Sequence, residues 1–262
     1  MTGYIYTDAH EYFMPPISIV GVGCLESALG YIKPLRLRKA LIVSDKPLVD
    51  SGLIESLLGR LDNQEILYIT YKDVSPNPTI AQVEYGLKLF LDNGCDFLIS
   101  FGGGSPTDCA KAIALLAANG GDIRDYEGIN KLKVTSAPLI AINTTAGTGS
   151  EITRFCVITD EERHLKMTIN DWHITPIIGV SDAELMTGMP PGLTAATGMD
   201  ALTHAIEAYT SKAATPITDC QAIKAIELIF TNLYNAYCDG NNMRAREAMA
   251  YAEYLAGAAF NN

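Results

Sequence analysis

The chain has 262 residues, of which 48% are hydrophobic and 19% charged, and its formal net charge is −11. This length accommodates one large domain or two domains with a core each. The acidic balance, with no basic run of five or more residues, argues against a nucleic-acid partner. No apolar run is long enough to span a bilayer, no secretory signal opens the chain, and the six cysteines form no CxxC pair. We therefore expect a cytoplasmic protein with reduced thiols and no membrane partner.

The first pattern in the chain is "GVGCLE" at residues 21–26, which resembles the opening of a dinucleotide fingerprint. Glu26 stands where the third glycine is required, and no acidic residue ends a second strand at the expected distance. We interpret this stretch as a tight turn.

Short apolar runs then alternate with amphipathic segments. The runs "KALIVSD" (39–45) and "EILYIT" (65–70) predict strands, and "IAQVEYGLKLFLDNG" (80–94) predicts a helix closed by Gly94. "CDFLISFGGG" leads from a strand into a glycine loop, with a helix expected from Pro106, and "APLIAINTTAGTGSE" repeats the strand-into-loop pattern. The alternation predicts an α/β fold with a doubly wound, mostly parallel sheet covered on both faces, over residues 1–188.

The pattern changes near Met189. Residues 189–262 contain three helical segments with no strand between them, so we expect an all-helical domain to begin here. The last segment keeps its apolar helical spacing up to Phe260 without a stop signal, which predicts an incomplete helical domain.

Two loops are candidates for nucleotide binding. In "SFGGGSPTDCAK" the glycines let a phosphate approach the backbone, and the following helix offers free N–H groups. Ser105 either donates to a phosphate or caps the helix, and Asp108 is expected in the first helical turn. The second loop, residues 143–151, supplies hydroxyl donors that include Thr144, Thr145 and Thr148. Two such loops at the carboxyl ends of parallel strands suit a nucleotide, although a glycine turn by itself is often a plain loop.

Asp45 follows an early strand and is placed to accept hydrogen bonds from ribose hydroxyls. Its carboxylate would repel a 2′-phosphate, which favours NAD over NADP. The alternative is a turn residue before Pro47, and spacing leaves both open.

Asp200 and His204 lie four residues apart in "TGMDALTHAIEAYTS", so they share one face of a predicted helix. A carboxylate and an imidazole suit Zn²⁺ or Fe²⁺, but tight binding needs at least three protein ligands. An exposed polar pair on a helix is the simpler alternative for these two residues alone.

Together, "FGGGSPTDCAKAIA", "NTTAGTGSE" with "RFCVITD", and "LTAATGMDALTHAIEAYTSK" resemble the iron-containing (group III) alcohol dehydrogenases, most of all their 1,3-propanediol dehydrogenase-like branch. The resemblance implies a dehydroquinate synthase-like fold with a cleft between an α/β and a helical domain. It also implies a homo-oligomer that acts on a small alcohol or aldehyde with NAD and a divalent metal, usually iron and sometimes zinc. By the same resemblance the NAD site is lined by Asp45, Gly103, Gly104, Ser105, Asp108, Thr144, Thr145, Thr148, Phe155, Lys166 and Leu185.

The resemblance assigns Asp200 and His204 to the metal and so to catalysis, with two further histidines from later helices that this sequence does not contain. Relative to that pattern the chain looks C-terminally truncated, so we expect weak metal binding and weak or lost turnover. The alternative of a different class is a non-catalytic nucleotide-binding or assembly fragment.

Overall fold

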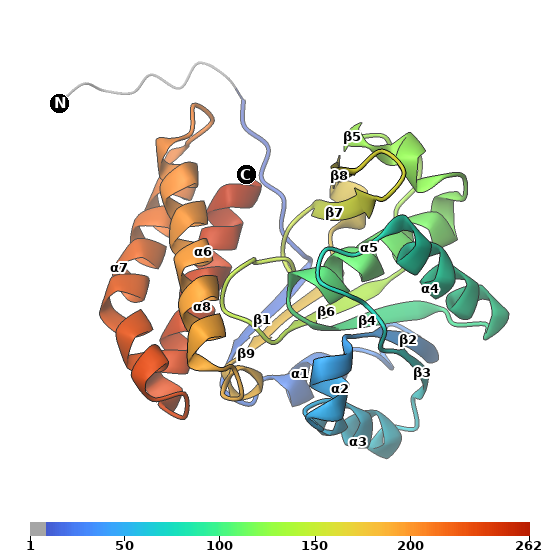
Figure 1. Cartoon of the computed structure of the whole chain (residues 1–262), viewed down its shortest axis with the longest axis horizontal. Coiled ribbons are helices and arrows are strands. Elements are labelled where there is room, and N and C mark those ends of the chain that lie inside the picture. The colour runs from blue at the N-terminus through green and yellow to red at the C-terminus, as the bar shows by residue number, and fades with distance from the viewer. Residues whose placement is uncertain (1–8) are drawn as a thin grey trace.

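The computed structural model describes residues 9–262, and its centre is a six-stranded sheet in the order β1-β9-β6-β4-β2-β3 (Figure 1). Every neighbouring pair in this sheet is parallel, so the predicted doubly wound α/β fold is confirmed. The strands are β1 (Ile17–Gly21), β2 (Lys39–Val43), β3 (Leu67–Tyr71), β4 (Phe97–Gly102), β6 (Leu139–Asn143) and β9 (Ile178–Asp182).

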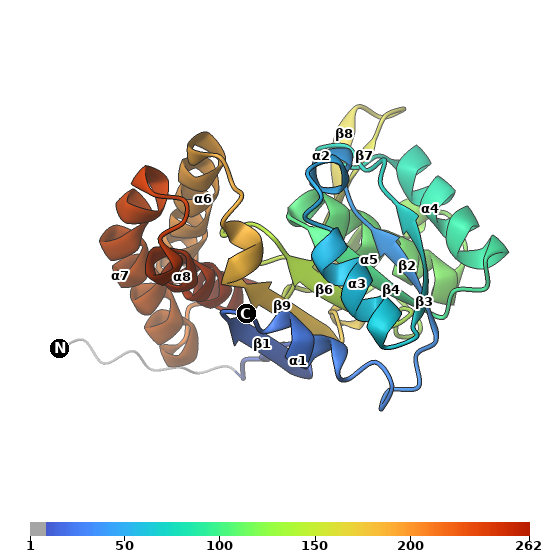
Figure 2. The ribbon, with the colours of Figure 1, turned by 90° about the horizontal axis from the view of Figure 1, so that it is seen from below.

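Helices cover both faces of the sheet (Figures 1 and 2). Leu41 and Leu98 belong to the core beneath α4 and α5, whereas their neighbours Ile42 and Ile99 belong to the core on the side of α1 and α3. Because alternate residues are buried on opposite faces, these strands appear in the sequence as continuous apolar runs. The helices are α1 (Leu25–Leu29), α2 (Lys46–Asp50), α3 (Glu55–Asn63), α4 (Ile80–Asp92) and α5 (Gly104–Asn119).

The stretch "GVGCLE" forms the predicted tight turn between β1 and α1. Gly23 has φ +69°, a conformation that favours glycine. The carboxylate of Asp182, at the end of β9, accepts from the backbone N–H of Gly23 and of Leu25, both at 2.9 Å. The Asp182 carboxylate thereby satisfies a backbone donor of the turn and one at the first residue of α1.

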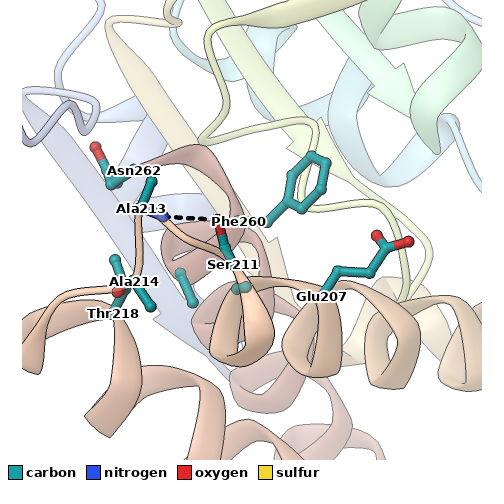
Figure 3. Close-up of a pocket in the computed structure, with 9 residues that line it drawn as sticks. Glu207, Ser211, Ala213, Ala214, Thr218, Phe260 and Asn262 are labelled. Carbon is teal, nitrogen blue, oxygen red and sulfur yellow. Dashed lines mark hydrogen bonds between the residues drawn. The ribbon is translucent and has the colours of Figure 1, made fainter.

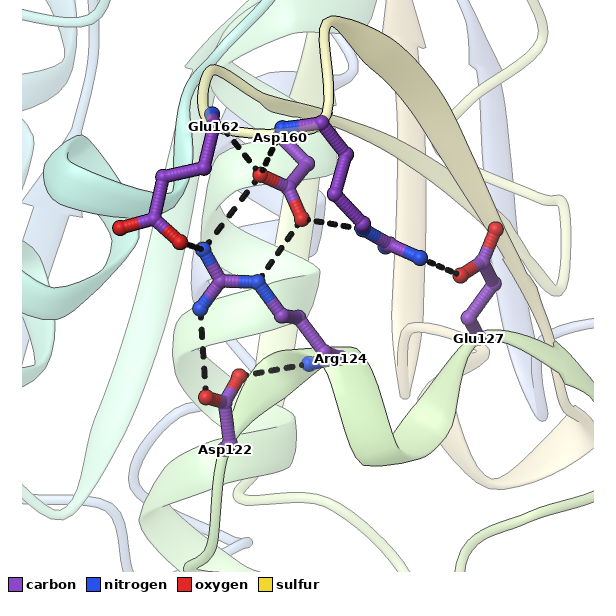
Figure 4. Close-up of polar contacts among 6 residues, drawn as sticks. Asp122, Arg124, Glu127, Asp160 and Glu162 are labelled. Carbon is purple, nitrogen blue, oxygen red and sulfur yellow. Dashed lines mark hydrogen bonds and ion pairs between the residues drawn. The ribbon is translucent and has the colours of Figure 1, made fainter.

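A small second sheet flanks α5, and its loops carry an ion-pair network (Figure 4). The buried carboxylate of Asp160 accepts from Arg124 Nε at 2.8 Å and from Arg163 Nε at 2.6 Å. The outer nitrogens of the two arginines reach Glu162 and Glu127. The elements here are η1 (Ile123–Tyr126), β5 (Gly128–Ile129), β7 (Phe155–Asp160), β8 (Leu165–Asn170) and η2 (Trp172–Ile174).

We expect Asp160→Asn to lower the melting temperature at pH 7 by a few degrees. The hydrogen bonds from Arg124 hold the pKa of Asp160 well below its usual range. The carboxylate therefore stabilises the fold above the ordinary pKa, and this stabilisation is lost as pH falls through the folded-state value. Thermal unfolding of both proteins between pH 3 and pH 8 checks this. A difference in melting temperature that does not narrow toward pH 3 would contradict it.

Three long helices follow the sheet: α6 (Pro191–Thr210), α7 (Pro216–Cys238) and α8 (Met243–Asn261), preceded by η3 (Ala183–Met186). They pack on one another around Ala201, Ala205, Ile229 and Met249, and α8 also packs against β1 and β9 at the edge of the sheet (Figure 2). No strand lies among residues 191–262, as predicted. We propose a domain boundary at residues 188/189, between η3 and α6.

Within residues 9–262, no helix combines the length and the apolar character needed to cross a bilayer.

Candidate functional site

A pocket of about 600 Å³ opens where the carboxyl ends of the parallel strands face the helical segments. It brings together residues from β3–α4, the start of α5, the loop after β6, the β7–β8 hairpin and α6. This volume lies in the range of small-molecule and cofactor sites. Of the residues singled out from the sequence, those in its wall are Gly104, Ser105, Asp108, Thr148, Phe155, Lys166, Asp200 and His204.

The glycine loop delivers the amino end of α5 to this pocket. The helix begins at Gly104 with Gly103 as its N-cap, so Pro106 lies in its first turn, as predicted. An added Cβ on Gly103 would lie 3.0 Å from the Thr145 side chain, and one on Gly104 would lie 3.1 Å from Thr148. Both distances are tighter than an ordinary Cβ contact, so a larger residue at either position would displace a threonine of the second loop by a few tenths of an ångström. The free N–H groups and positive dipole end of α5 suit a phosphate.

Two details of this helix start differ from the sequence expectation. Ser105 does not cap the helix, because it lies inside the first turn and its hydroxyl accepts from Asn77 N–H at 3.3 Å. Asp108 is the fifth residue of the helix rather than part of its first turn, and its carboxylate accepts from Val157 N–H at 3.1 Å. Asp108 therefore links α5 to β7 while it lines the pocket.

Burial raises the pKa of Asp108 from 3.8 to about 6, although Lys111 and the Val157 N–H oppose the shift. Unfolding releases this proton between those pH values, so the contribution to stability is present below pH 3.8 and is lost as pH rises through 6. We expect Asp108→Asn to be more stable than the unsubstituted chain by about 1–2 kcal/mol at pH 8, with little difference near pH 4. Urea unfolding at both pH values checks this, with the surface variant Asp50→Asn as the control for loss of a charge.

The loop after β6 is held in place through its backbone N–H groups and by close packing. Thr144 N–H donates to the carbonyl of Gly102 at 3.1 Å, and Asn143 Oδ1 accepts from Thr145 N–H at 3.0 Å. Gly149, at φ +61°, packs against α8 so closely that a Cβ there would lie 2.8 Å from Gly257 Cα. The loop is therefore clamped between the glycine loop on one side and the helical segments on the other.

The β7–β8 hairpin forms the opposite wall. Phe155 begins β7, and Lys166 on β8 is exposed at the pocket. The fully buried Lys111 holds this wall to α5, because its Nζ donates to the carbonyls of Thr153 at 2.7 Å and Phe155 at 2.8 Å.

Five of the expected cofactor residues do not line the pocket. Gly103, Thr144 and Thr145 lie directly behind its wall in the two loops. Asp45 is the N-cap of α2, and its Oδ1 accepts from Leu48 N–H at 2.9 Å, so it has the local structural role that the sequence left open. Leu185 lies in η3 and is 5% exposed.

Asp200 and His204 lie on the α6 face that borders the pocket. Nε2 of His204 is 3.9 Å from Oδ1 of Asp200, and its ring packs on Phe260 with the centroids 4.7 Å apart. A tetrahedral ion with bonds of about 2.1 Å places its ligand atoms about 3.4 Å apart, so a small side-chain adjustment would bring this pair onto a shared ion. No group of three or more candidate ligands occurs among residues 9–262. Within this part of the chain, Asp200 and His204 are a pair of candidate ligands.

A second cavity of about 360 Å³ lies on the other side of Phe260 (Figure 3). Small residues at the end of α6 and the start of α7 form much of its wall, and Glu207 and Ser211 are its polar side chains on α6. Phe260 thus separates this cavity from the pocket that contains His204.

Comparison with known families identifies what this arrangement is. The model of iron-containing alcohol dehydrogenase matches residues 15–183, and that of the C-terminal part of the Fe-containing alcohol dehydrogenase family matches residues 194–262. The chain belongs to this family. The family recognised from the three sequence motifs is therefore confirmed.

Individual relatives agree. The chain is 52% identical over 251 residues to "Alcohol dehydrogenase 4" of Schizosaccharomyces pombe, covering 96% of this chain and 60% of the relative. It is 48% identical to an "NAD-dependent methanol dehydrogenase" of Bacillus methanolicus, covering 96% and 66%. A solved structure of a 1,3-propanediol oxidoreductase superposes with a TM-score of 0.95 at 44% identity, covering 97% of this chain and 67% of that one. The chain thus spans less than two thirds of the length of these curated relatives.

Sequence reasoning missed part of the site. Asn77 and Pro78, in the turn after β3, line the pocket, as do Thr153 and Val157. The turn-forming "SPNPT" was a usable signal, because it follows a strand whose parallel orientation places its carboxyl end at the same edge of the sheet. The buried contacts of Glu253 on α8 had no such signal, since they join segments distant in the chain.

Proposed function

We propose that this chain carries the nucleotide-binding part and two metal ligands of an NAD-dependent alcohol dehydrogenase, which interconverts a primary alcohol or diol and its aldehyde by metal-assisted hydride transfer. The observation that carries the proposal is one pocket that joins the amino end of α5 to Asp200 and His204. Membership of the iron-containing alcohol dehydrogenase family supports it.

The two loops would bind the cofactor. The N–H groups at Gly104, the hydroxyl of Ser105 and that of Thr148 suit the pyrophosphate, while Phe155 and Lys166 form the wall beyond it. Asp108 would border the cofactor from the wall of the pocket, while Gly103, Thr144, Thr145 and Leu185 would shape this site from behind or from the side. Asp45 retains one carboxylate oxygen beyond its contact with Leu48 for a ribose hydroxyl, which favours NAD over NADP.

Asp200 and His204 would hold a divalent ion, iron or zinc. Such an ion, when bound, polarises an alcohol oxygen so that its proton is lost near neutral pH. The chain's own share is to orient the alcohol beside the cofactor and to keep water out, and Phe260 covers one side of His204 for this purpose. Because residues 9–262 offer two ligands and no larger group, we expect the ion to bind weakly and turnover by this chain to be low.

The experiment is calorimetric titration of NAD and NADP, with metal analysis and NAD-linked oxidation of 1,3-propanediol on the same sample. NAD binding in the micromolar range, preferred over NADP, supports the proposal. Absence of NAD binding would overturn it, whatever the metal content.

A second candidate is a non-catalytic nucleotide-binding or assembly module. An apolar groove of about 410 Å³ lies between α6 and α7, and Phe230 and Tyr234 beside it are 74% and 75% exposed. A face of this kind is typical of an interface, so we also propose a homo-oligomer. Light scattering separates the candidates: a monodisperse monomer with turnover counts against the module.

We further propose a cytoplasmic location, which the six free cysteines favour.

A further inference from the structure

Two carboxyl groups are buried together between the sheet and α8. Glu151 follows the loop after β6, Glu253 lies on α8, and both are fully buried. Asn143, at the end of β6, donates from its single Nδ2 to Glu253 Oε1 at 2.8 Å and to Glu151 Oε2 at 3.1 Å. Ser181 on β9 donates to the other oxygen of Glu151 at 2.8 Å. The Asn143 amide thus binds one carboxyl from the sheet side, Glu151, and one from α8, Glu253.

The pair lacks a cation among residues 9–262. The nearest one, Lys111 on α5, directs its Nζ to Thr153 and Phe155 instead, and the other titratable side chain that faces the pair is Tyr254 on α8. Burial and the adjacent Glu151 raise the pKa of Glu253 well above its usual range. Two neighbouring buried carboxyls retain one proton between them.

That proton completes the hydrogen bonding of the pair. Oε2 of Glu253 is buried and lacks a well-formed hydrogen bond within residues 9–262. The carboxyl faces Glu151, to which a protonated Glu253 would donate, and the backbone N–H of Gly149, while its Oε1 accepts from Asn143 at 2.8 Å.

The same network reaches the cofactor loop. Oδ1 of Asn143 accepts from both the N–H and the hydroxyl of Thr145, at 3.0 and 3.1 Å. Four residues beyond Glu253, on the same face of α8, Gly257 packs against Gly149. Glu253 and Gly257 therefore hold the two ends of the loop against α8.

We propose that Glu253 is a positioning residue for the nucleotide: by sharing a proton with Glu151 and accepting from Asn143, it fixes the loop of residues 144–150 whose Thr148 and Ser150 line the pocket. The inference rests on the proposed function, since it names that site's nucleotide loop as the segment positioned. It requires no contact between Glu253 and the cofactor.

The test compares Glu253→Gln with Glu253→Leu. Glutamine keeps an N–H donor for Glu151 and an oxygen that accepts from Asn143, so we expect its NAD dissociation constant to stay within about twofold of the unsubstituted value. Leucine removes both and leaves buried polar groups unpaired, so we expect about tenfold weaker NAD binding and faster amide hydrogen exchange over residues 144–150. Glu247→Gln, a loss of one carboxylate on the same helix, is the control.

Unfolding against pH tests the shared proton independently. A carboxyl with a raised folded-state pKa stabilises the fold below its unfolded pKa, and this is lost as pH rises through the folded value. In that range the unfolding constant of the unsubstituted chain should rise relative to that of Glu253→Gln by up to about tenfold per pH unit. The contribution of Asp108 is common to both proteins and cancels. If the unfolding constants of the two proteins changed with pH in the same way, the inference of a shared proton would be wrong.

The outcomes distinguish this inference from the proposed function. If the unsubstituted chain binds no NAD, the proposed function fails, and hydrogen exchange in the two variants still decides whether Glu253 anchors the loop. If NAD binds and both variants bind it equally well, the inference fails and the function stands. If glutamine weakens binding as much as leucine, the shared proton is likewise overturned.

Discussion

Replacing Gly149 with alanine should weaken NAD binding about tenfold and destabilise the fold by about 2–5 kcal/mol. Gly149 has φ +61°, which costs a residue with a Cβ about 1–2 kcal/mol. Its Cβ would also lie 2.8 Å from Gly257 Cα, a backbone atom that cannot rotate away. Overpacking of this kind adds about 1–3 kcal/mol, and the loop that carries Thr148 must shift to relieve it. Calorimetric NAD titration and urea unfolding measure the two effects.

The chain offers a matched control at Gly94. Its φ is +60°, and among residues 9–262 no atom lies within 4 Å of an added Cβ. Gly94→Ala therefore introduces the backbone strain without the clash, and we expect a loss of about 1–2 kcal/mol with unchanged NAD affinity. Equal losses of stability and affinity in the two variants would mean that the contact of Gly149 with Gly257 does not position the loop.

The fold was predictable where a local sequence pattern, such as an apolar run, matched the burial of the element that it forms. The strands at 39–45 and 65–70 appear as β2 (Lys39–Val43) and β3 (Leu67–Tyr71). β2 is apolar throughout because it is buried on both faces, whereas β3 lies at the edge of the sheet with Leu67 exposed. Pro106 lies in the first turn of α5, as its sequence pattern predicts. Glycine is a poor helix former, so the first residue of the helix, Gly104, was not predictable; its missing Cβ leaves room for Thr148, a tertiary contact that the sequence near Pro106 does not show.

The loops of the candidate site were predictable from the sequence, whereas the residues that hold these loops in place were not. Strand ends in a parallel sheet meet at one edge, so Gly104 and Thr148 were expected to lie close together. Glu253 is different, because it bonds Asn143 across 110 residues of sequence. In the sequence a glutamate on a helix is typical of its solvent-facing side, and only the packing of α8 on the sheet shows that this one is fully buried.

Replacing His204 with alanine should abolish metal binding and lower any NAD-linked alcohol turnover at least about a hundredfold, with NAD affinity unchanged. The ring and Asp200 form the pair of metal-ligand candidates that α6 presents to the pocket, so loss of either would weaken the hold on the ion that would polarise the alcohol. The cofactor loops at Gly104 and Thr148 come from other elements and keep their mutual contacts. Asp200→Ala should act in the same direction.

Metal titration followed by mass spectrometry gives a measurement that does not require turnover. The unsubstituted chain should take up Fe²⁺ or Zn²⁺ weakly, with two protein ligands, and His204→Ala should take up none. The control is His164→Asn, an exposed histidine at φ +51°, where asparagine is well tolerated. Equal metal uptake by the three proteins would place the ion elsewhere. Asp200 and His204 would then be a polar pair whose position in the pocket wall serves the alcohol or the cofactor directly.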